Sequence, residues 1–239
     1  MPLPRISTPQ YELELPSTGE TIQYRPFLVK EEKLLVIALE SEDTKQITTA
    51  IKNVIKNCIH TKGIKVESLP TFDIEYLFLN IRGKSVGEEI EVNIICPDDE
   101  TTNVPVKIDL DSIKVQFSEE HSKQIKIDNS IMMEMKYPSL DQFIKNNFDF
   151  SQNNAMDQSF DLIASCVDKI YTEDEVWSSA DVTKKELIDF LEQMNSAQFK
   201  EIEKFFETMP KLSHKIQITN PNTKVESEVV IEGLASFFA

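Results

Sequence analysis

The chain has 239 residues, with 25 Lys and Arg against 41 Asp and Glu, and its formal net charge is −16. Hydrophobic residues make up 40% and charged residues 28%, a composition that is typical of globular proteins and excludes a wholly disordered chain. The negative charge argues against nucleic acid as a partner, because Lys and Arg supply most of the affinity for phosphates. A chain of this length can bury one large core or two small ones.

Targeting signals are not found in the sequence. Residues 1–5 lack the apolar stretch of a secretory signal. The longest apolar run, Leu34–Leu39, is far shorter than the roughly 20 residues of a membrane span. Cys58, Cys96 and Cys166 are widely separated, which is typical of proteins in a reducing cytosol. We therefore expect a cytoplasmic protein that makes no membrane contact.

The N-terminal part predicts two strands followed by three helices. Alternating apolar residues indicate a pair of strands within residues 10–29, and a helix is expected from Lys30 to Glu40. Apolar residues from Ile47 to Cys58 recur at i, i+3, i+4, i+7, i+8 and i+11, which is one continuous helix face. The helix expected from Pro70 to Ile81 is apolar on nearly all sides, so it should be central in the fold.

After Gly87 the apolar period changes from 3.6 to 2, which predicts β-structure. A first hairpin is expected at about residues 90–110, with its tip at Pro97–Glu100. Three further extended segments are expected at 113–117, 125–127 and 131–135. The pattern therefore indicates several short strands in the middle of the chain.

The C-terminal part is mainly helical by its pattern. In chain order we expect a short helix at 140–147, a helix at 160–171, an acidic turn at 173–175, a helix opened by the capping box Thr183–Glu186, and a helix capped by Ser196. The last two helices are amphipathic and joined by a short connection, so they should form an αα-hairpin. A terminal β-hairpin at about 213–234 follows them.

The terminal hairpin repeats the first one. The segments 96–110 and 220–234 have equal length, and each begins with a residue followed by proline. This tip pattern resembles a zinc knuckle, in which C-x-x-C at each of two tips supplies four thiolates. The knuckle positions are held here by Cys96, Asp99, Asn220 and Thr223. These side chains cannot close a zinc site, so we expect no metal and predict that hydrogen bonds join the two tips instead.

Together the elements predict an α+β fold. N-terminal strands and helices lead into a β-hairpin region, and a C-terminal helical region is closed by a second β-hairpin that resembles a zinc ribbon without its metal ligands. Pro138 disfavours helix just before it and marks a boundary between residues 1–137 and 138–239. The sequence leaves open whether these parts are separate domains or one folded unit, and packing between the hairpins would make them one.

No motif for catalysis or cofactor binding is complete. Gly83-Lys84-Ser85 is similar to the end of a phosphate-binding loop, but Phe78 stands where that loop needs a glycine. Asp109 and Asp111 could serve a metal-dependent enzyme, although no second group in the sequence orients them. We therefore predict that the protein is not an enzyme and holds no cofactor.

Five segments spread over nearly the whole chain carry a family resemblance. They are Arg25–Lys33 (RPFLVKEEK), Leu69–Phe78 (LPTFDIEYLF), Lys84–Glu88 (KSVGE), Phe205–Leu212 (FFETMPKL) and Glu232–Phe238 (EGLASFF). In this order they resemble the baseplate hub subunits and baseplate hub assembly proteins of T-even-like contractile-tailed bacteriophages. Members of that family often carry paired cysteines at the hairpin tips, and this sequence departs from that pattern. The resemblance therefore implies no metal-dependent property for this chain.

The resemblance implies a non-enzymatic role in tail morphogenesis, as a hub subunit or as a hub assembly factor. Such a protein would act through contacts with other baseplate hub or tail proteins, in the host cytoplasm during assembly and, for a subunit, in the virion baseplate. The aromatic residues proposed for partner binding are Phe205, Phe206, Phe237 and Phe238. The alternatives are a nucleic-acid-binding module derived from a zinc ribbon and a tail assembly chaperone for another tail protein. The oligomeric state stays open.

Overall fold

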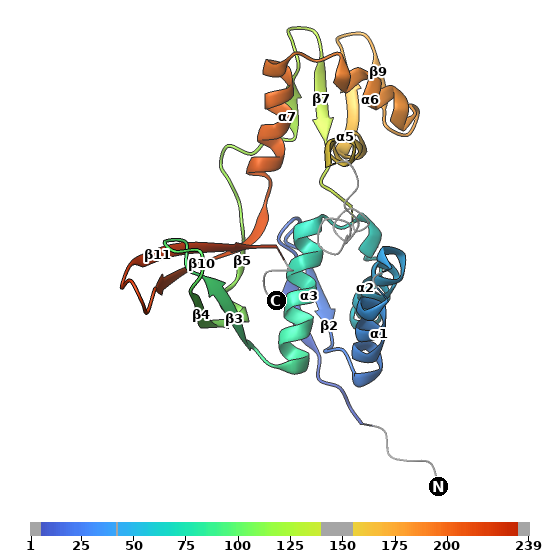
Figure 1. The fold of residues 1–239 in the computed structure, drawn as a ribbon. Helices are drawn as coiled ribbons and strands as arrows, with labels where there is room; N and C mark the ends of the chain where they lie inside the picture. Colours follow the sequence, from blue (N-terminus) through green and yellow to red (C-terminus); the bar gives the residue numbers. More distant parts are fainter. Residues whose placement is uncertain (1–5, 42, 140–154, 234–239) are drawn as a thin grey trace.

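The computed structural model describes residues 6–41, 43–139 and 155–233, and it confirms the α+β fold (Figure 1). The elements of the first half are β1 (Tyr11–Glu14), β2 (Thr21–Tyr24), α1 (Val29–Glu40), α2 (Thr44–Cys58), the 3-10 turn η1 (Val66–Ser68), α3 (Thr71–Val86), β3 (Glu89–Ile95), β4 (Asn103–Asp109), the 3-10 turn η2 (Leu110–Ser112) and β5 (Lys114–Gln116). The predicted strand pair, helices and first hairpin in this half are confirmed, with ends that differ by a few residues.

The second half has β6 (Gln124–Lys126), β7 (Met132–Met135), α5 (Ala155–Cys166), β8 (Val167–Tyr171), β9 (Val176–Ser178), α6 (Lys184–Glu192), α7 (Ser196–Thr208), β10 (Lys211–Thr219) and β11 (Glu226–Glu232). The strands form small antiparallel sheets rather than one large sheet. Their orders are β1-β2, β3-β4, β11-β10-β5 and β6-β7-β8-β9. The described residues contain no helix that is both long and apolar enough to span a membrane.

Two hydrophobic clusters hold the fold together. The first core takes its buried residues from Leu13 to Ile113 and from the terminal hairpin, and the second core takes its buried residues from Ile125 to Phe205. The chain therefore leaves the first core after β5 and returns to it with β10, which pairs with β5. The boundary expected near residue 137 stays a prediction, while the terminal hairpin shares its core with the N-terminal elements.

Helix α3 is central, as its apolar sequence predicts. Its buried residues include Asp73, Ile74, Glu75 and Gly83, which lie on different sides of the helix. In Figure 1, α1 and α2 lie on one side of α3 and the β3–β4 and β10–β11 hairpins on the other. The first core is thus a three-layer arrangement in which α3 is the middle layer.

Two predictions in the second core are wrong. The helix expected at 160–171 ends at Cys166, and Val167–Tyr171 forms β8 between β7 and β9. Val167 continues the helical stripe, so the apolar period alone does not mark the change, although Ile170 and Tyr171 are residue types that favour strands. The cap of α7 is Asn195 rather than Ser196, because the Asn195 side chain accepts hydrogen bonds from the N–H groups of the first turn.

The other C-terminal expectations have mixed outcomes. The capping box of α6 is present, with Thr183 and Glu186 bonded reciprocally. Instead of packing mainly on one another as an αα-hairpin, α6 packs against α5 and α7 against β6. The acidic turn at 173–175 joins β8 to β9. The short helix expected at 140–147 lies outside the described residues.

Candidate interaction sites

The tips of the two long hairpins begin with the same backbone turn. In the first tip the N–H of Glu100 donates to the carbonyl of Cys96, and in the second the N–H of Lys224 donates to the carbonyl of Asn220, each at 2.9 Å. Glu100 and Lys224 both have positive φ, at 53° and 64°, an uncommon conformation for residues other than glycine. The repeat detected in the sequence is therefore a structural repeat at the tips.

The equal lengths of 96–110 and 220–234 predict that Ile108 corresponds to Glu232, but in the structure the second strands match with a displacement of one residue. Ile90 pairs with Ile108 in the first hairpin, and His214 pairs with Ile231 in the second. The buried counterpart of Ile108 is therefore Ile231 and not Glu232. The reason is that the second tip is one residue shorter, which reverses the inward and outward alternation of the strand that follows.

The two tips are hydrogen-bonded to one another, which confirms the predicted tip-to-tip contact. The side-chain nitrogen of Asn220 lies 3.0 Å from both carboxylate oxygens of Asp98 and from Oδ2 of Asp99. The Thr223 hydroxyl donates to Asp98, and the Asn222 amide donates to the Thr102 hydroxyl. The first tip supplies chiefly acceptors and the second tip supplies donors, so the pair is complementary without a metal.

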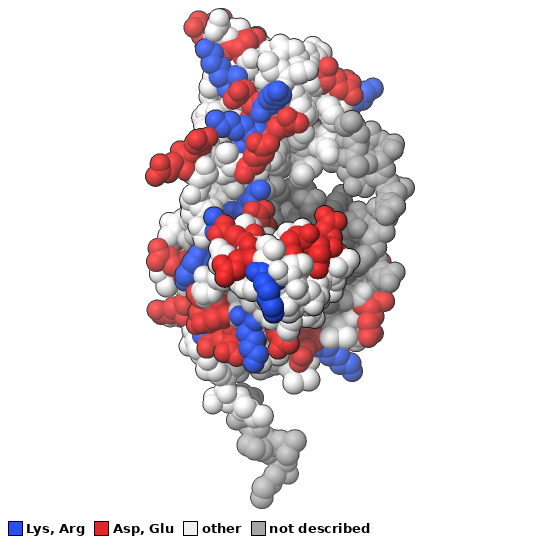
Figure 2. All heavy atoms as spheres, turned by 60° about the vertical axis from the view of Figure 1, so that its left-hand side comes forward, with Lys and Arg blue, Asp and Glu red and all other residues white. Residues whose placement is uncertain are grey.

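These contacts favour the charged form of the carboxyl groups. Hydrogen bonds from Asn220 and Thr223 hold the pKa of Asp98 below its usual value, and bonds from Thr102 and Asn220 do the same for Asp99. Burial and the neighbouring carboxylates raise the pKa of the Cys96 thiol. Among the described residues, no group of three His, Cys, Asp or Glu side chains could hold a metal ion. Figure 2 shows that the face carrying the hairpins is rich in acidic side chains.

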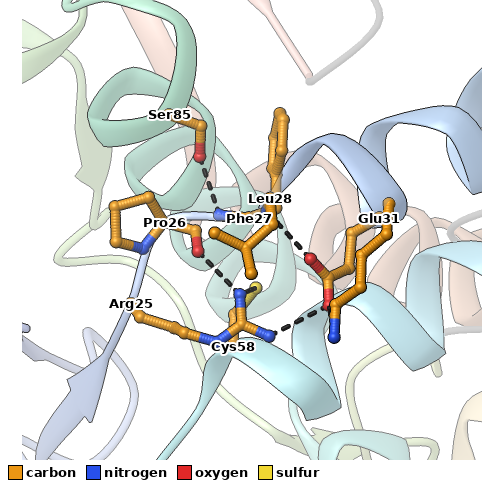
Figure 3. A network of polar contacts seen from close by, with 8 residues as sticks. Arg25, Pro26, Phe27, Leu28, Glu31, Cys58 and Ser85 are labelled. Atoms are coloured by element: carbon orange, nitrogen blue, oxygen red, sulfur yellow. Dashed lines mark hydrogen bonds and ion pairs between the residues drawn. The ribbon is translucent and has the colours of Figure 1, made fainter. Parts of the chain in front are cut away.

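A second polar network fixes the start of α1 (Figure 3). Arg25 Nη2 lies 3.0 Å from Glu31 Oε1, and the backbone N–H of Leu28 donates to Glu31 Oε2 at 2.8 Å. Arg25 also donates to the Pro26 carbonyl at 2.8 Å. The backbone N–H of Phe27 donates to the Ser85 hydroxyl at 2.9 Å. The network thus joins two of the segments that carry the family resemblance, 25–33 and 84–88.

Glu31 is 1% exposed and stays ionised because its charge is compensated. Burial alone would raise the pKa of Glu31, but the hydrogen bonds from Arg25 and Leu28 and the Arg25 charge hold it below the usual value. Cys58 lies in the same network, and burial raises the pKa of its thiol to about 11, which makes it unreactive at neutral pH. The network therefore has a structural role, and sequence reasoning missed it because burial of Glu31 has no local signal.

Helix α1, whose start is fixed by this network, has apolar side chains on the side that faces the solvent. On that side Val29, Val36 and Ile37 are 80%, 48% and 50% exposed, and Leu34 and Leu39 flank them with 50% and 43%. We name these five side chains the outer α1 surface. Apolar side chains that are exposed together on one helix are typical of surfaces that contact another protein.

The aromatic residues predicted for partner binding have different positions. Phe205 is 2% exposed and packs against His121 and Tyr137, so its ring belongs to the second core. Phe206 is partly exposed and contacts Phe205 edge-on. Phe237 and Phe238 lie outside the described residues. A partner role for these residues stays a prediction, and the outer α1 surface exposes more apolar area than Phe205 does.

The paired carboxylates considered for an enzyme have a local structural role. Asp109 caps the turn η2 by accepting a hydrogen bond from the backbone N–H of Asp111 at 3.0 Å. Asp111 in turn lies 3.7 Å from the amine of Lys84. The carboxyl groups thus serve the connection between β4 and β5, and nothing in this arrangement directs them at a common ligand.

Comparison with known proteins gives one match. A family model described as "T4 bacteriophage base plate protein" matches residues 8–239. No match was found among curated proteins or among solved structures. The matched segment contains both polar networks, the outer α1 surface and both hydrophobic cores.

Proposed function

This chain belongs to the T4 bacteriophage base plate protein family, and from that premise we propose that it is a baseplate hub subunit or a hub assembly factor. Membership gives the protein a structural or assembly role in the phage tail, with other baseplate proteins as its partners. The observation that supports the baseplate assignment is the extent of the match, which covers residues 8–239. The hub role rests on the resemblance of the five segments named in the sequence analysis.

The structure supports action by protein contacts rather than by chemistry. The side chains that could take part in catalysis already have structural roles. Asp98 and Asp99 accept hydrogen bonds, and Cys58 is buried with a raised thiol pKa. The outer α1 surface, by contrast, presents apolar side chains on a helix that is anchored by the Arg25–Glu31 pair. Anchoring matters for recognition, because a surface that is already ordered loses less conformational entropy on binding.

The first experiment is to quantify this chain by mass spectrometry in purified phage particles and in infected-cell lysate. A fixed, small copy number per particle identifies a hub subunit. Abundance in the lysate with absence from particles identifies an assembly factor or chaperone that leaves the tail before completion. Particles that form normally and at full yield without the chain would contradict the proposal.

A second experiment tests the outer α1 surface. The double substitution Val36→Lys and Ile37→Lys should leave the fold intact, since both side chains are about half exposed. It should reduce the yield of complete tails at least about tenfold. Val230→Lys on β11 is a matched control, because Val230 is 45% exposed and lies on the terminal hairpin, away from α1 in the sequence. Equal yields for the α1 variant and for the control would exclude this surface as the contact.

A further inference from the structure

An apolar groove lies in the second core, between β9 and α6. It has a volume of about 270 Å³ and is lined mainly by Ile170, Trp177, Val182, Leu187 and Phe190. Trp177 is 40% exposed, and its neighbour Val176 is 66% exposed. Trp177 is also the only tryptophan of the chain. Partly exposed tryptophans beside a groove are frequent anchors in protein interfaces.

One wall of the groove, Trp177, belongs to a strand with a free edge. β9 is the outer strand in the order β6-β7-β8-β9, and its residues pair with β8 through Ile170↔Trp177 and Tyr171↔Val176. Within the described ranges, no strand pairs with the other edge of β9. An edge of this kind can accept an extended peptide as a further strand, while a groove beside it receives an alternate side chain.

The chain segment that supplies most of the groove is strongly negative. The segment from Tyr171 to Glu192 contains seven acidic and two basic residues, a net charge of −5. The acidic residues Glu173, Asp174 and Glu175 are exposed in the turn that leads into β9, and Glu186 lines the groove itself. Of the two lysines, Lys184 is paired with Asp161 at 2.7 Å. A basic occupant is therefore favoured over an acidic one.

We propose that this groove binds an extended basic segment of another tail protein. The segment adds to the free edge of β9, places one apolar side chain beside Trp177 and directs its Lys or Arg side chains toward the carboxylates. A second copy of this chain is a poor occupant, since each copy carries a net charge of −16. The assignment of the segment to a tail protein rests on the proposed function, while the chemistry of the groove does not.

The fluorescence of Trp177 tests the proposal directly, because no other tryptophan contributes to the emission. The probe is a synthetic peptide of about ten residues in which lysine alternates with valine around a central phenylalanine. We expect a saturable blue shift of the emission with a Kd in the micromolar range, weakened about tenfold when the salt concentration rises from about 50 to about 500 mM. The matched control peptide carries glutamate in place of lysine and should leave the emission unchanged.

A charge variant sharpens the test without altering the groove. Glu173→Gln, Asp174→Asn and Glu175→Gln together should weaken binding of the lysine peptide about tenfold or more, because they remove three exposed charges beside β9. The control variant neutralises three exposed acidic residues of the first hairpin, Glu89, Glu91 and Glu100, and should bind the lysine peptide like the native chain.

Three results would overturn the proposal. They are an unchanged emission up to about 1 mM lysine peptide, equal binding of the glutamate peptide, and an emission shift that depends on protein concentration alone, which would make a second copy the occupant. The particle measurements described above decide the proposed function separately. If the chain binds the peptide but plays no part in tail formation, the groove is still a site for basic peptides, and only the proposal that its partner is a tail protein fails.

Discussion

The two polar networks of the first core connect distant segments in opposite ways. The Arg25–Glu31 network lies inside the molecule, where Glu31 is 1% exposed and a cation compensates its charge. At the hairpin tips, Asp98 and Asp99 accept hydrogen bonds from neutral donors, with Asn220 as the buried member. Both networks hold ionised carboxylates with lowered pKa values, but only the buried one needs an ion pair.

The difference shows how a hairpin pair can keep its packing without a metal. Near water a carboxylate keeps much of its hydration, so amide and hydroxyl donors are sufficient partners. The two tip backbones share a hydrogen bond from the fifth residue to the first and the positive φ of Glu100 and Lys224. If this interpretation is correct, the metal site can be restored at the tips, and the buried network should tolerate much less change than the tips do.

The largest effect is expected from restoring the knuckle. Asp99→Cys, Asn220→Cys and Thr223→Cys together with the native Cys96 place four thiols at the two tips. At a zinc concentration of about 1,000 times Kd, binding should stabilise this variant by about 4 kcal/mol. Thermal unfolding with and without zinc measures the effect, and elemental analysis gives the stoichiometry.

The native chain is the control for that variant, and its melting temperature should not respond to zinc. A variant that folds but binds no zinc would show that the tips share only hydrogen-bonding geometry with a knuckle. In that case the repeat would remain a pair of similar turns without a metal-site geometry.

The next largest effect is expected from Glu31→Ala, which leaves Arg25 without its buried partner. Removing one member of a buried pair typically costs about 3 kcal/mol or more. The exposed neighbour Glu32 provides a matched control, since Glu32→Ala changes the same helix turn and should cost less than about 0.5 kcal/mol. Urea unfolding monitored by circular dichroism measures both. Similar losses for the two variants would mean that the buried pair contributes no more than a surface charge.

Asn220→Ala should have a smaller effect, a fall in melting temperature of about 3–6 °C. It removes the amide of the second tip that donates to both Asp98 and Asp99 of the first tip. The loss should also depend on pH. The hydrogen bond from Asn220 lowers the pKa of Asp98 in the folded state, so its contribution is present above a pH of about 4 and is lost as the pH falls through the folded-state pKa. The difference in melting temperature between the variant and the native chain should begin to shrink below about pH 4, and a constant difference down to about pH 2 would contradict this origin.

Sequence reasoning succeeded where one residue pattern determines one structure. The helix face from Ile47 to Cys58 and the alternation in β3 and β4 each specify their element, because side-chain period follows from backbone geometry. The tip-to-tip contact could also be predicted, since the two tips share a proline after the first knuckle position. The one-residue displacement in β11 could not be, because loop length decides the register and the two loops differ by one residue.

The missed features depend on contacts between distant segments. Val167 satisfies a helical stripe and a strand equally well, and only pairing with β7 and β9 selects the strand. The burial of Glu31 follows from the position of Arg25, which a helix pattern does not contain. The Trp177 groove likewise forms only when α6 packs beside β9. A lone tryptophan after an acidic turn was the one sequence signal that could have indicated it.

The smallest predicted effect has the opposite sign and concerns Asp73, a third carboxylate that joins distant segments. Asp73 is fully buried and accepts hydrogen bonds from the backbone N–H and the hydroxyl of Ser17. The start of α3 favours a negative charge there, yet burial outweighs this and raises the pKa of Asp73. Unlike Glu31, this carboxylate has no cation beside it in the described part of the chain, so its ionised form costs stability at neutral pH.

Asp73→Asn keeps an acceptor for the Ser17 N–H and removes the buried charge, so it should raise the melting temperature at pH 7 by about 1–3 °C. Because the folded-state pKa is raised, the native chain gains stability as the pH falls through that pKa. The advantage of the variant should therefore shrink between neutral pH and about pH 4. Asp73→Ala is the control, which loses both acceptors and should be less stable than the native chain at every pH. A destabilised Asn variant at pH 7 would mean that the charge at the start of α3 outweighs its burial.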